Sequence, residues 1–390
     1  MKKGWKTVPM GKLCSISSGE SDTQDAVADG PYAFFDRSKT IKRSSRFLYD
    51  CEALIIPGEG KEFLPKHFEG KFDLHQRAYA LFDFLPDLDV RFLYHLLHHR
   101  SDYFPSVAVG ATVKSLRRRH FDDLPVPVPP LPEQQRIVGI LDQAFEGIAT
   151  AKANAEKNLH NARALFESHL QSVFTQRGKG WVKKRLDEVC TFSSGGTPSK
   201  SNSSYWSGEI PWVSGRDMKS TRLSDSLLHI SRSAVDESST RMAPAGALLI
   251  LVRGMGLAHG AQIAELMVPC AFNQDIRGIH PKPDLIPRYL LFALRDRINS
   301  SNTVLSNAAH GTLKIDSDEL QSVMIPVPPH EHQQRIVTTI DSLTEETQRL
   351  ESIYQQKLAA LEALKKSLLH QAFSGQLTRD NGELIRDNRQ

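Results

Sequence analysis

Basic and amide side chains cluster in short polar turns that stand beside strand-like runs, and they do so in two separate parts of the chain. Arg, Lys, Gln and Asn hydrogen-bond to guanine and adenine edges, while Lys, Ser and Thr contact phosphates. Surface loops of any protein carry such residues, but their recurrence as two different sets on a duplicated chain favours two sequence readers over ordinary solvated loops. We expect nucleic-acid contacts from Arg37, Lys39, Lys42, Arg43, Lys61, Gln76, Arg77 and Lys114 in the first part, and from Ser214, Arg216, Lys219, Arg253, Asn273, Gln274 and Lys314 in the second.

Motifs for catalysis are incomplete. The glycines at 254, 256 and 260 follow a buried run, but their GxGxxxG spacing is not the GxGxxG of a dinucleotide site and no βαβ unit follows, which favours a tight turn. Neither a Walker A sequence nor the Asn/Asp-Pro-Pro-aromatic tetrapeptide of amino-methyltransferases occurs. Glu-x-Lys at Glu59–Lys61 lacks the upstream carboxylate of a metal-dependent nuclease. We therefore predict no catalytic residue in this chain.

Three histidines stand at i, i+3 and i+4 of one expected helix, at His95, His98 and His99, a spacing that suits zinc. The corresponding stretch of the second half, Phe292 to Asp296, holds no histidine. A metal site common to both halves is therefore excluded, and we expect a solvated helix face and no metal.

The chain is a tandem duplication. A proline-rich run followed by Gln-Gln-Arg-Ile-Val occurs at Gln134–Val138 and again at Gln333–Val337, 199 residues later. The starts of the halves, Gly4–Gly19 and Gly180–Gly195, also correspond, whereas the middles differ by insertions. This pattern indicates one scaffold used twice, with two different binding preferences.

Each proline-rich run should be extended, because proline fixes φ and disfavours helix in the residue before it. Helix formers follow over Leu131–Phe174 and His330–Phe373, 44 residues or about 65 Å each at 1.5 Å per residue. Apolar residues recur every three or four positions on both helices, which predicts that the helices pack on each other. We expect this packing from Ile137, Leu141, Ile148, Leu159, Ile336, Ile340, Leu350, Leu358 and Leu361.

The remaining sequence predicts two α+β modules that are mostly sheet. The expected order is a module over 1–130, a spacer helix over 131–177, a second module over 178–329, a second spacer helix over 330–376 and a tail over 377–390. Strands are predicted at Tyr32–Phe35, Ala53–Ile56, Arg77–Phe84, Ile210–Val213, Ala247–Val252, Gln262–Ala264 and Asp275–His280, and shorter helices at Val90–His99 and Pro287–Ile298.

Composition fits a globular protein, with 40% hydrophobic and 24% charged residues and a net charge of +4 whose positive excess lies in the two modules. The four cysteines lack CxxC spacing, and Cys14 and Cys190 occupy equivalent places, so we expect core residues rather than disulfides. The longest apolar run, Ala247–Val252, is too short to span a bilayer, and the first residues lack the apolar segment of a signal peptide. We expect a cytoplasmic protein.

Several motifs together resemble the specificity subunit of type I restriction-modification systems, from about residue 4 to residue 378. They are PVPVPPLPEQQRIV and IPVPPHEHQQRIV before the spacer helices, GGTPSKSNSSYWSGEIPWVSGRDMK at 195–219, GALLILVRG at 246–254 with NQD at 273–275, and LLHQAFSGQL at 368–377. The first module departs from the family pattern between Glu20 and Arg46.

The resemblance implies two target-recognition domains held apart by two antiparallel helices that form a coiled-coil spacer, each domain reading one half of a bipartite, asymmetric DNA site. It implies no catalysis by this chain. Its expected partners are double-stranded DNA, two modification subunits that bind S-adenosylmethionine and methylate adenine, and ATP-dependent restriction subunits with Mg²⁺.

Two other classes are compatible with the sequence. A coiled-coil adaptor would bind DNA without sequence preference, and the specificity chain of another restriction-modification type would differ only in its copurifying subunits. The DNA target, the gap between half-sites and their orientation are not encoded in any motif found here.

Overall fold

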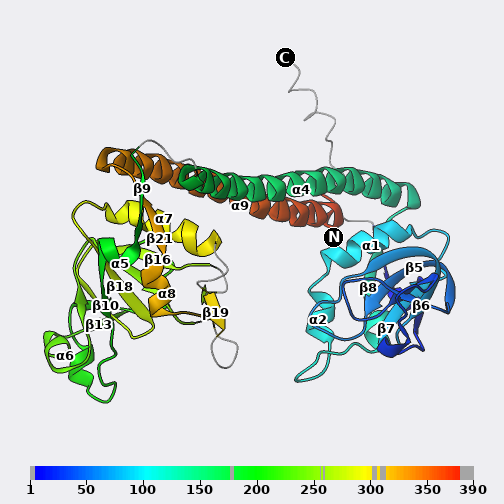
Figure 1. Ribbon diagram of the computed structural model, residues 1–390. Coiled ribbons are helices and arrows are strands. Elements are labelled where there is room, and N and C mark those ends of the chain that lie inside the picture. Colours follow the sequence, from blue (N-terminus) through cyan, green and yellow to red (C-terminus); the bar gives the residue numbers. More distant parts are fainter. Residues whose placement is uncertain are drawn as a thin grey trace. The chain divides into compact units, whose positions relative to one another are not determined.

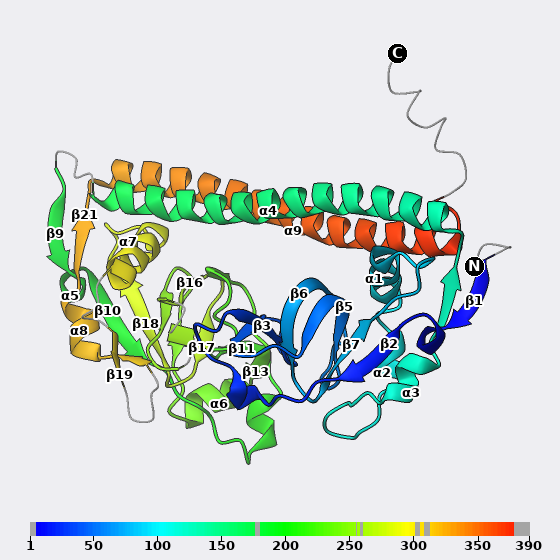
Figure 2. The same ribbon diagram turned by 90° about the vertical axis from the view of Figure 1, so that its right-hand side faces the viewer.

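The computed structural model describes residues 5–175, 180–254, 256–257, 260–300, 305–307 and 313–377 (Figure 1, Figure 2). By their contacts the residues form two units: unit 1 is Met1–Lys157 with Tyr354–Gln390, and unit 2 is Asn158–Ile353. We call residues 1–130 module 1 and residues 178–329 module 2. Each unit therefore combines one module with parts of both long helices.

The long helices are α4 (Leu131–Thr175) and α9 (His330–Ser374), which begin where the sequence predicts and end one residue later. They lie side by side and antiparallel (Figure 1). Two ion pairs show this arrangement: Lys152 of α4 pairs with Glu362 of α9 in unit 1, and Arg163 of α4 pairs with Glu351 of α9 in unit 2. Ile137, Leu141 and Ile340 are buried, and Ile148, Leu159, Ile336, Leu350, Leu358 and Leu361 are half-buried.

Module 1 is built on a six-stranded sheet of order β2-β7-β5-β6-β3-β4. Its strands are β1 (Lys6–Pro9), β2 (Ser15–Ser18), β3 (Tyr32–Phe35), β4 (Lys42–Ser44), β5 (Tyr49–Pro57), β6 (Lys66–Leu74), β7 (Ala78–Phe82) and β8 (Pro125–Val128), and its helices are α1 (Val90–His99), α2 (Tyr103–Val107) and α3 (Arg118–Asp122). In Figure 1, α1 lies between this sheet and the long helices.

Module 2 contains a five-stranded sheet of order β10-β18-β15-β16-β12 and a four-stranded sheet of order β13-β11-β17-β14. Its strands are β9 (Val182–Arg185), β10 (Cys190–Ser194), β11 (Ile210–Val213), β12 (Arg222–Leu223), β13 (Leu228–Ile230), β14 (Met242–Ala243), β15 (Leu248–Leu251), β16 (Ile263–Leu266), β17 (Cys270–Phe272), β18 (Ile276–Pro281), β19 (Leu305–Asn307), β20 (Leu313–Ile315) and β21 (Met324–Val327). Its helices are α5 (Leu186–Val189), α6 (Arg232–Glu237), α7 (Pro287–Ser300) and α8 (Ser317–Ser322).

The α+β class and the two spacer helices are confirmed, as are the strands at Tyr32–Phe35 and Ile210–Val213 and the helix Val90–His99. Strand β6 is not among the predicted elements. Its interior Gly70 has φ of 116°, a conformation that glycine adopts at little cost, and it leaves one position of the alternating pattern without a side chain.

The proline-rich runs are the last strands of their modules, and each is extended as predicted. β8 pairs antiparallel with β1, and β21 pairs antiparallel with β9. Proline has no N–H for a sheet ladder, so a two-stranded ribbon is a place that tolerates it. The pairing brings the two ends of each module together at the start of the spacer helix that follows it.

Both long helices complete the hydrophobic core of each unit. In unit 1 the core includes Leu141 of α4 and Phe373 of α9, and in unit 2 it includes Phe174 of α4 and Ile340 of α9. A module and its two helix segments therefore share one hydrophobic core.

The first glutamine of each Gln-Gln-Arg motif is buried and bonded entirely to backbone. In unit 1, Gln134 accepts from the N–H of Asp89 at 2.8 Å and donates to the carbonyls of Asp87 and Pro129, both at 2.8 Å. Asp89 is the N-cap of α1, so one amide ties the start of α1 to the start of α4.

Gln333 repeats this joint in unit 2. It accepts from the N–H of Ile286 at 2.9 Å and donates to the carbonyls of Asp284 and Pro328, both at 3.0 Å. The repeated motif is therefore explained by the same three backbone partners in each copy.

A repeated ion pair lies about two turns further along each spacer helix. Arg91 of α1 donates to Asp142 at 2.9 Å, and the equivalent Arg288 of α7 donates to Asp341 at 2.8 Å. The second pair is the more buried, since the Arg288 side chain is 7% exposed against 52% for Arg91. Each module helix is thus fixed to its spacer helix at two points.

Two remaining expectations concern the cysteines and the membrane. All four cysteines are free, and burial raises the pKa of the Cys14 and Cys190 thiols to about 12, as suits core residues. Among the described residues, no helix is both long enough and apolar enough to cross a bilayer.

Replacing Gln134 with Leu should destabilise unit 1. The substitution removes the amide partner of one part-buried N–H (Asp89), one part-buried carbonyl (Asp87) and one buried carbonyl (Pro129). This loss costs about 3 kcal/mol, at roughly 1 kcal/mol per group. For a unit of this size that lowers Tm by roughly 6–12 °C in differential scanning calorimetry.

The matched control is Gln135→Leu, at the exposed second glutamine of the same motif. We expect it to change Tm by less than about 2 °C. Equal effects of the two substitutions would contradict the role assigned to the buried amide.

Candidate nucleic-acid interface

A hollow of about 560 Å³ in unit 1 collects three of the predicted basic residues. Arg37 and Lys39 reach it from the turn after β3, and Lys61 reaches it from the turn after β5. Glu59, Glu62, Lys66 and His98 also line it. Basic and acidic groups therefore both line this hollow.

Glu59 organises the basic residues beside the hollow. Its carboxylate, 12% exposed, pairs with Arg37 at 3.2 Å and with Arg77 at 2.6 Å, and accepts from the Ser115 hydroxyl at 3.3 Å. The N–H of Gly60 donates to the Lys114 carbonyl at 3.0 Å, which draws the loop carrying Lys114 to the same turn. Segments far apart in the sequence thus meet at one carboxylate.

Both arginines keep donors for another partner. A guanidinium has five N–H groups, and the contacts with Glu59 use one terminal nitrogen of each side chain. The side chains of Arg37 and Arg77 are 49% and 57% exposed. Glu59 therefore positions both guanidinium groups and leaves several of their N–H donors available.

The other predicted residues of module 1 do not line this hollow. Lys42 pairs with the buried Asp36 at 2.6 Å, and Gln76 donates to Asp22 at 3.3 Å. Arg43 donates to the carbonyls of Gly30 and Pro31 at 2.7 and 2.9 Å, which fastens the segment before β3 to β4. The donors of Arg43 are thus largely engaged by its own module.

In module 2, parallel strands β11 and β17 end side by side, and their carboxyl ends bring Ser214 and Asn273 together. The N–H of Asn273 donates to the Val213 carbonyl at 3.0 Å. Asp217 accepts from the N–H and the hydroxyl of Ser214, both at 2.8 Å, which closes the loop that follows β11. Arg216 lies on this loop, exposed, with no ion pair to any residue that the structure describes.

Further predicted residues join the same strand ends. Arg253 follows β15 and forms an isolated bridge with Lys314, whose ammonium pairs with Asp316 at 2.7 Å. The N–H of Val252 donates to the Asp275 carbonyl at 2.8 Å, so this segment adjoins the Asn273 turn. Gln274, in that turn, accepts from the Thr197 hydroxyl at 2.6 Å.

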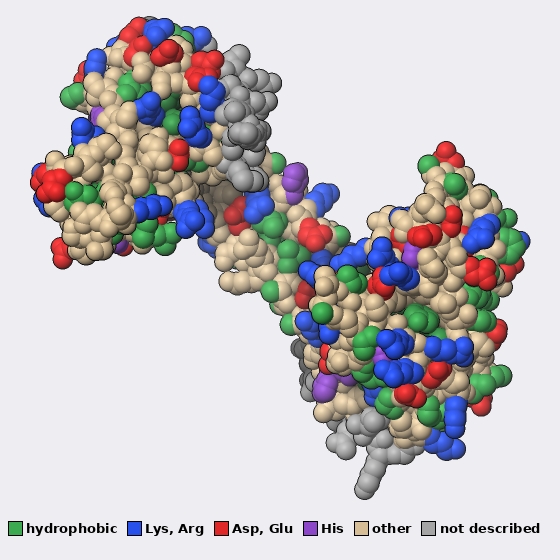
Figure 3. Space-filling model, turned by 90° about the horizontal axis from the view of Figure 1, so that it is seen from below, with side chains coloured by type: hydrophobic (Ala, Val, Ile, Leu, Met, Phe, Trp, Pro, Cys, Tyr) green, Lys and Arg blue, Asp and Glu red, His purple; other side chains and the backbone are tan. Residues whose placement is uncertain are grey.

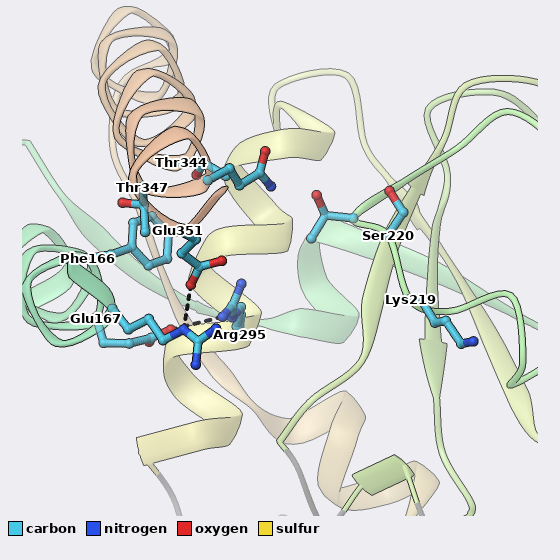
Figure 4. Close-up of a pocket in the computed structure, with 11 residues that line it drawn as sticks. Phe166, Glu167, Lys219, Ser220, Arg295, Thr344, Thr347 and Glu351 are labelled. Carbon is cyan, nitrogen blue, oxygen red and sulfur yellow. Dashed lines mark hydrogen bonds and ion pairs between the residues drawn. The ribbon is translucent and has the colours of Figure 1, made fainter. Parts of the chain in front are cut away.

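Lys219 stands three residues after Arg216, at the end of the same loop. It lines a hollow of about 470 Å³ whose other walls include Arg163, Glu351 and Arg295. Figure 4 shows Lys219 and Ser220 on one side and helix residues on the other, with dashed lines marking the ion pairs within the hollow. Lys219 therefore lines a hollow beside the spacer helices, while its N–H donates to the Asp217 carbonyl at 2.8 Å within the loop that carries Arg216.

A run of three arginines, Arg117 to Arg119, is missing from the predicted set although the sequence displays it. All three are exposed at the start of α3. The N–H of Leu116 donates to the Gly58 carbonyl at 2.7 Å, which places the run beside the turn that holds Glu59. Figure 3 shows basic and acidic side chains interspersed on the visible face of each unit.

The histidine-bearing face of α1 is not solvated, contrary to the expectation from sequence. His95 is 3% exposed, and its Nε2 lies 2.8 Å from Asp142 of α4. His98 lines the unit 1 hollow, and its Nε2 has no hydrogen-bond partner among the described residues. Within the described part of the chain, no group of three His, Cys, Asp or Glu side chains is arranged to hold a metal ion.

Comparison with known proteins places two stretches of the chain in one family. The family model described as "Type I restriction modification DNA specificity domain" matches residues 2–159 and 178–362. The specificity subunit of the Escherichia coli type I restriction enzyme EcoR124I/EcoR124II is 33% identical over 224 residues, which are 56% of this chain and 54% of that protein. The EcoDI specificity subunit of Escherichia coli is 25% identical over 405 residues, covering 96% of this chain and 89% of that protein.

Solved structures share the fold. A chain described under "Structural basis underlying complex assembly and conformational transition of the type I R-M system" has a TM-score of 0.71 and 20% identity, with 95% of this chain and 98% of that chain covered. The HsdS subunit from Thermoanaerobacter tengcongensis has a TM-score of 0.55 and 19% identity, with 96% and 97% covered.

Mild acid should destabilise unit 1 through His98. Burial, with Lys365 and His95 adding to it, lowers the pKa of His98 to about 4, whereas an unfolded histidine titrates near 6.5. The unfolded chain therefore takes up the proton first, so stabilisation present above about pH 6.5 is lost as the pH falls toward 4. We expect Tm to fall between pH 7 and pH 5, and His98→Gln to flatten this slope.

His160→Gln, at an exposed histidine of α4, is the control and should keep the wild-type slope. An unchanged slope in His98→Gln would show that other groups carry the pH dependence.

Proposed function

We propose that this chain, which belongs to the family of type I restriction-modification DNA specificity subunits, reads a bipartite DNA site with one module for each half. Membership follows from the family match over both halves of the chain. The observation that carries the proposal is a duplicated scaffold whose strand ends present two different sets of basic and amide side chains. Specificity subunits of this family are not catalytic, so the chemistry belongs to other subunits.

In module 2 we assign base reading to the loop and turn at the ends of β11 and β17. Arg216 is exposed on a loop that Asp217 holds closed, and an arginine can bind guanine O6 and N7 through two N–H groups. Asn273 and Gln274 carry the amide that pairs with adenine. Ser214 and Lys314 suit phosphate contacts, which fix position without reading sequence.

In module 1 we assign the reading surface to the side chains around Glu59. Arg37 and Arg77 share its carboxylate, so both guanidiniums are oriented before DNA arrives. An oriented side chain loses less rotamer freedom on binding than a free one. Lys39, Lys61 and Lys114 stand close by and add positive charge for phosphates.

The partners we propose are two modification subunits, which supply S-adenosylmethionine-dependent methylation of a flipped adenine, and restriction subunits that use ATP and Mg²⁺. Two equivalent docking points for the modification subunits are supported by Leu165 of α4 and Leu364 of α9. These leucines stand 199 residues apart and are 72% and 47% exposed. Isolated leucines at equivalent places on two copies suit two copies of one partner.

Replacing Arg216 with Ala should relax base preference at one or two positions of one half-site, at a cost of about 1–3 kcal/mol in binding. Lys114→Ala and Lys314→Ala should instead weaken binding to all sequences and lower the salt slope by about one unit each. The measurement is selection of bound DNA from a random pool, with the modification subunit present, together with salt titrations.

Arg232→Ala is the matched control in module 2, because that side chain is 74% exposed and paired with Asp236 on α6. It should leave both half-sites unchanged. An Arg216→Ala protein that altered the other half-site as well would refute one independent reader per module.

Removing one heptad from each spacer helix, residues 148–154 with 347–353, should shorten the gap between preferred half-sites by roughly three base pairs. Seven residues span about 10 Å of helix, and a duplex turn of about 10 base pairs spans roughly 34 Å. The half-site sequences themselves should survive. Selection of bound DNA again gives the result.

Both deletions are needed, because each unit's core takes side chains from both helices. The control is deletion of 148–154 alone, which should lower stability because the two helices then differ in length. A paired deletion with an unchanged gap would favour an adaptor whose helices serve assembly only.

A further inference from the structure

Two ion pairs flank the apolar contact between the spacer helices. Lys152 lies 2.8 Å from Glu362 in unit 1, and Arg163 lies 2.5 Å from Glu351 in unit 2. Glu351 stands 199 residues after Lys152, and Glu362 stands 199 residues after Arg163. Each pair is therefore the duplicated image of the other.

The charges are sorted by helix. Both basic residues belong to α4, and both acidic residues belong to α9. We call the row of apolar residues along which α4 and α9 meet the apolar seam. Each of the four charged residues directly follows a half-buried residue of this seam, namely Ala151, Ala162, Leu350 and Leu361. All four therefore flank the seam in the same way, and only the sign of their charge differs between the helices.

The apolar seam alone does not distinguish pairing of α4 with α9 from pairing of either helix with its own copy in a second chain. Because α4 and α9 are copies, α4 can meet α4 of a second chain in the same antiparallel register. Position 152 would then face position 163 of the partner, which sets Lys152 against the partner's Arg163. In the corresponding pairing of α9, Glu351 would face the partner's Glu362, and like charges at such positions repel.

We propose that these four side chains select pairing of α4 with α9 and reject pairing of either helix with its own copy in a second chain. The surface is the charged border of the seam, and the partner it excludes is an identical helix. This selection goes beyond DNA reading, which does not require it. It would keep duplicated helices from joining two chains through like halves.

The effect accumulates over several contacts. One exposed ion pair changes an equilibrium constant by only about 1.4- to 5-fold. Joining two chains through like helices would replace four attractive contacts by four repulsive ones. The factors multiply, so discrimination of at least about tenfold is expected.

One double substitution tests this in the full-length chain. Lys152→Glu with Glu362→Lys inverts a single pair, so both contacts between α4 and α9 remain attractive. Each helix then carries one charge of each sign, and like helices also attract each other. The variant keeps its stability but loses its discrimination.

The matched control inverts both pairs, by Lys152→Glu, Arg163→Glu, Glu351→Arg and Glu362→Lys. This variant makes α4 acidic and α9 basic, so like helices repel as in the wild type. Arg163→Glu with Glu351→Arg is the mirror of the single inversion and should behave like it. Either single inversion suffices if the other lowers expression.

Two copies of the full chain with different tags are coexpressed, one tag is captured, and the other is quantified, with Tm recorded for each variant. We expect the single inversions to raise capture at least about tenfold over the wild type, with the fourfold inversion at the wild-type level. If the single and fourfold inversions were captured equally, the two chains would be joined by α4 of one chain pairing with α9 of the other rather than by like helices. That result would overturn the proposal. Unchanged capture in stable single inversions would overturn it too.

Discussion

One buried amide at the first turn of each spacer helix fixes the module to the helix that follows it. Gln134 and Gln333 each satisfy three backbone groups, two of them in the segment that precedes α1 or α7. Each backbone group left unpaired there would cost about 1 kcal/mol or more, a sizeable part of the roughly 5–15 kcal/mol by which a folded domain is typically stable. The orientation of each module's strand ends, and so of its basic side chains, depends on this joint.

Sequence reasoning succeeded where local chemistry decides the structure. The starts of α4 and α9 could be predicted from the proline runs before them, because proline disfavours helix in the preceding residue and the residues that follow are helix formers. It failed where a distant segment decides. The histidines of α1 looked solvated because nothing near them in sequence covers them, yet Asp142, some forty-seven positions away, pairs with the buried His95. Strand β6 depends similarly on pairing with β5 and β3.

The binding surfaces show the same division. Residue type alone pointed to Arg37, Arg77 and Lys114, but nothing in the sequence shows that Glu59 gathers them, because that contact unites three turns. Conversely, Arg43 has a suitable side chain, but its donors bind the backbone carbonyls of Gly30 and Pro31 in the same module. Side-chain chemistry is readable from sequence, whereas the competition between internal and external partners is settled only by the fold.

The composition of the two units has a consequence for synthesis on the ribosome. Unit 2 is one uninterrupted segment, whereas unit 1 joins the first part of the chain to the second half of its last helix. Leu369, Phe373 and Leu377 belong to the core of unit 1, so module 1 emerges first and yet waits for nearly the whole chain before its core can close. Nascent module 1 therefore spends most of translation with an open apolar face, and a premature stop in α9 would harm the module encoded farthest away from it.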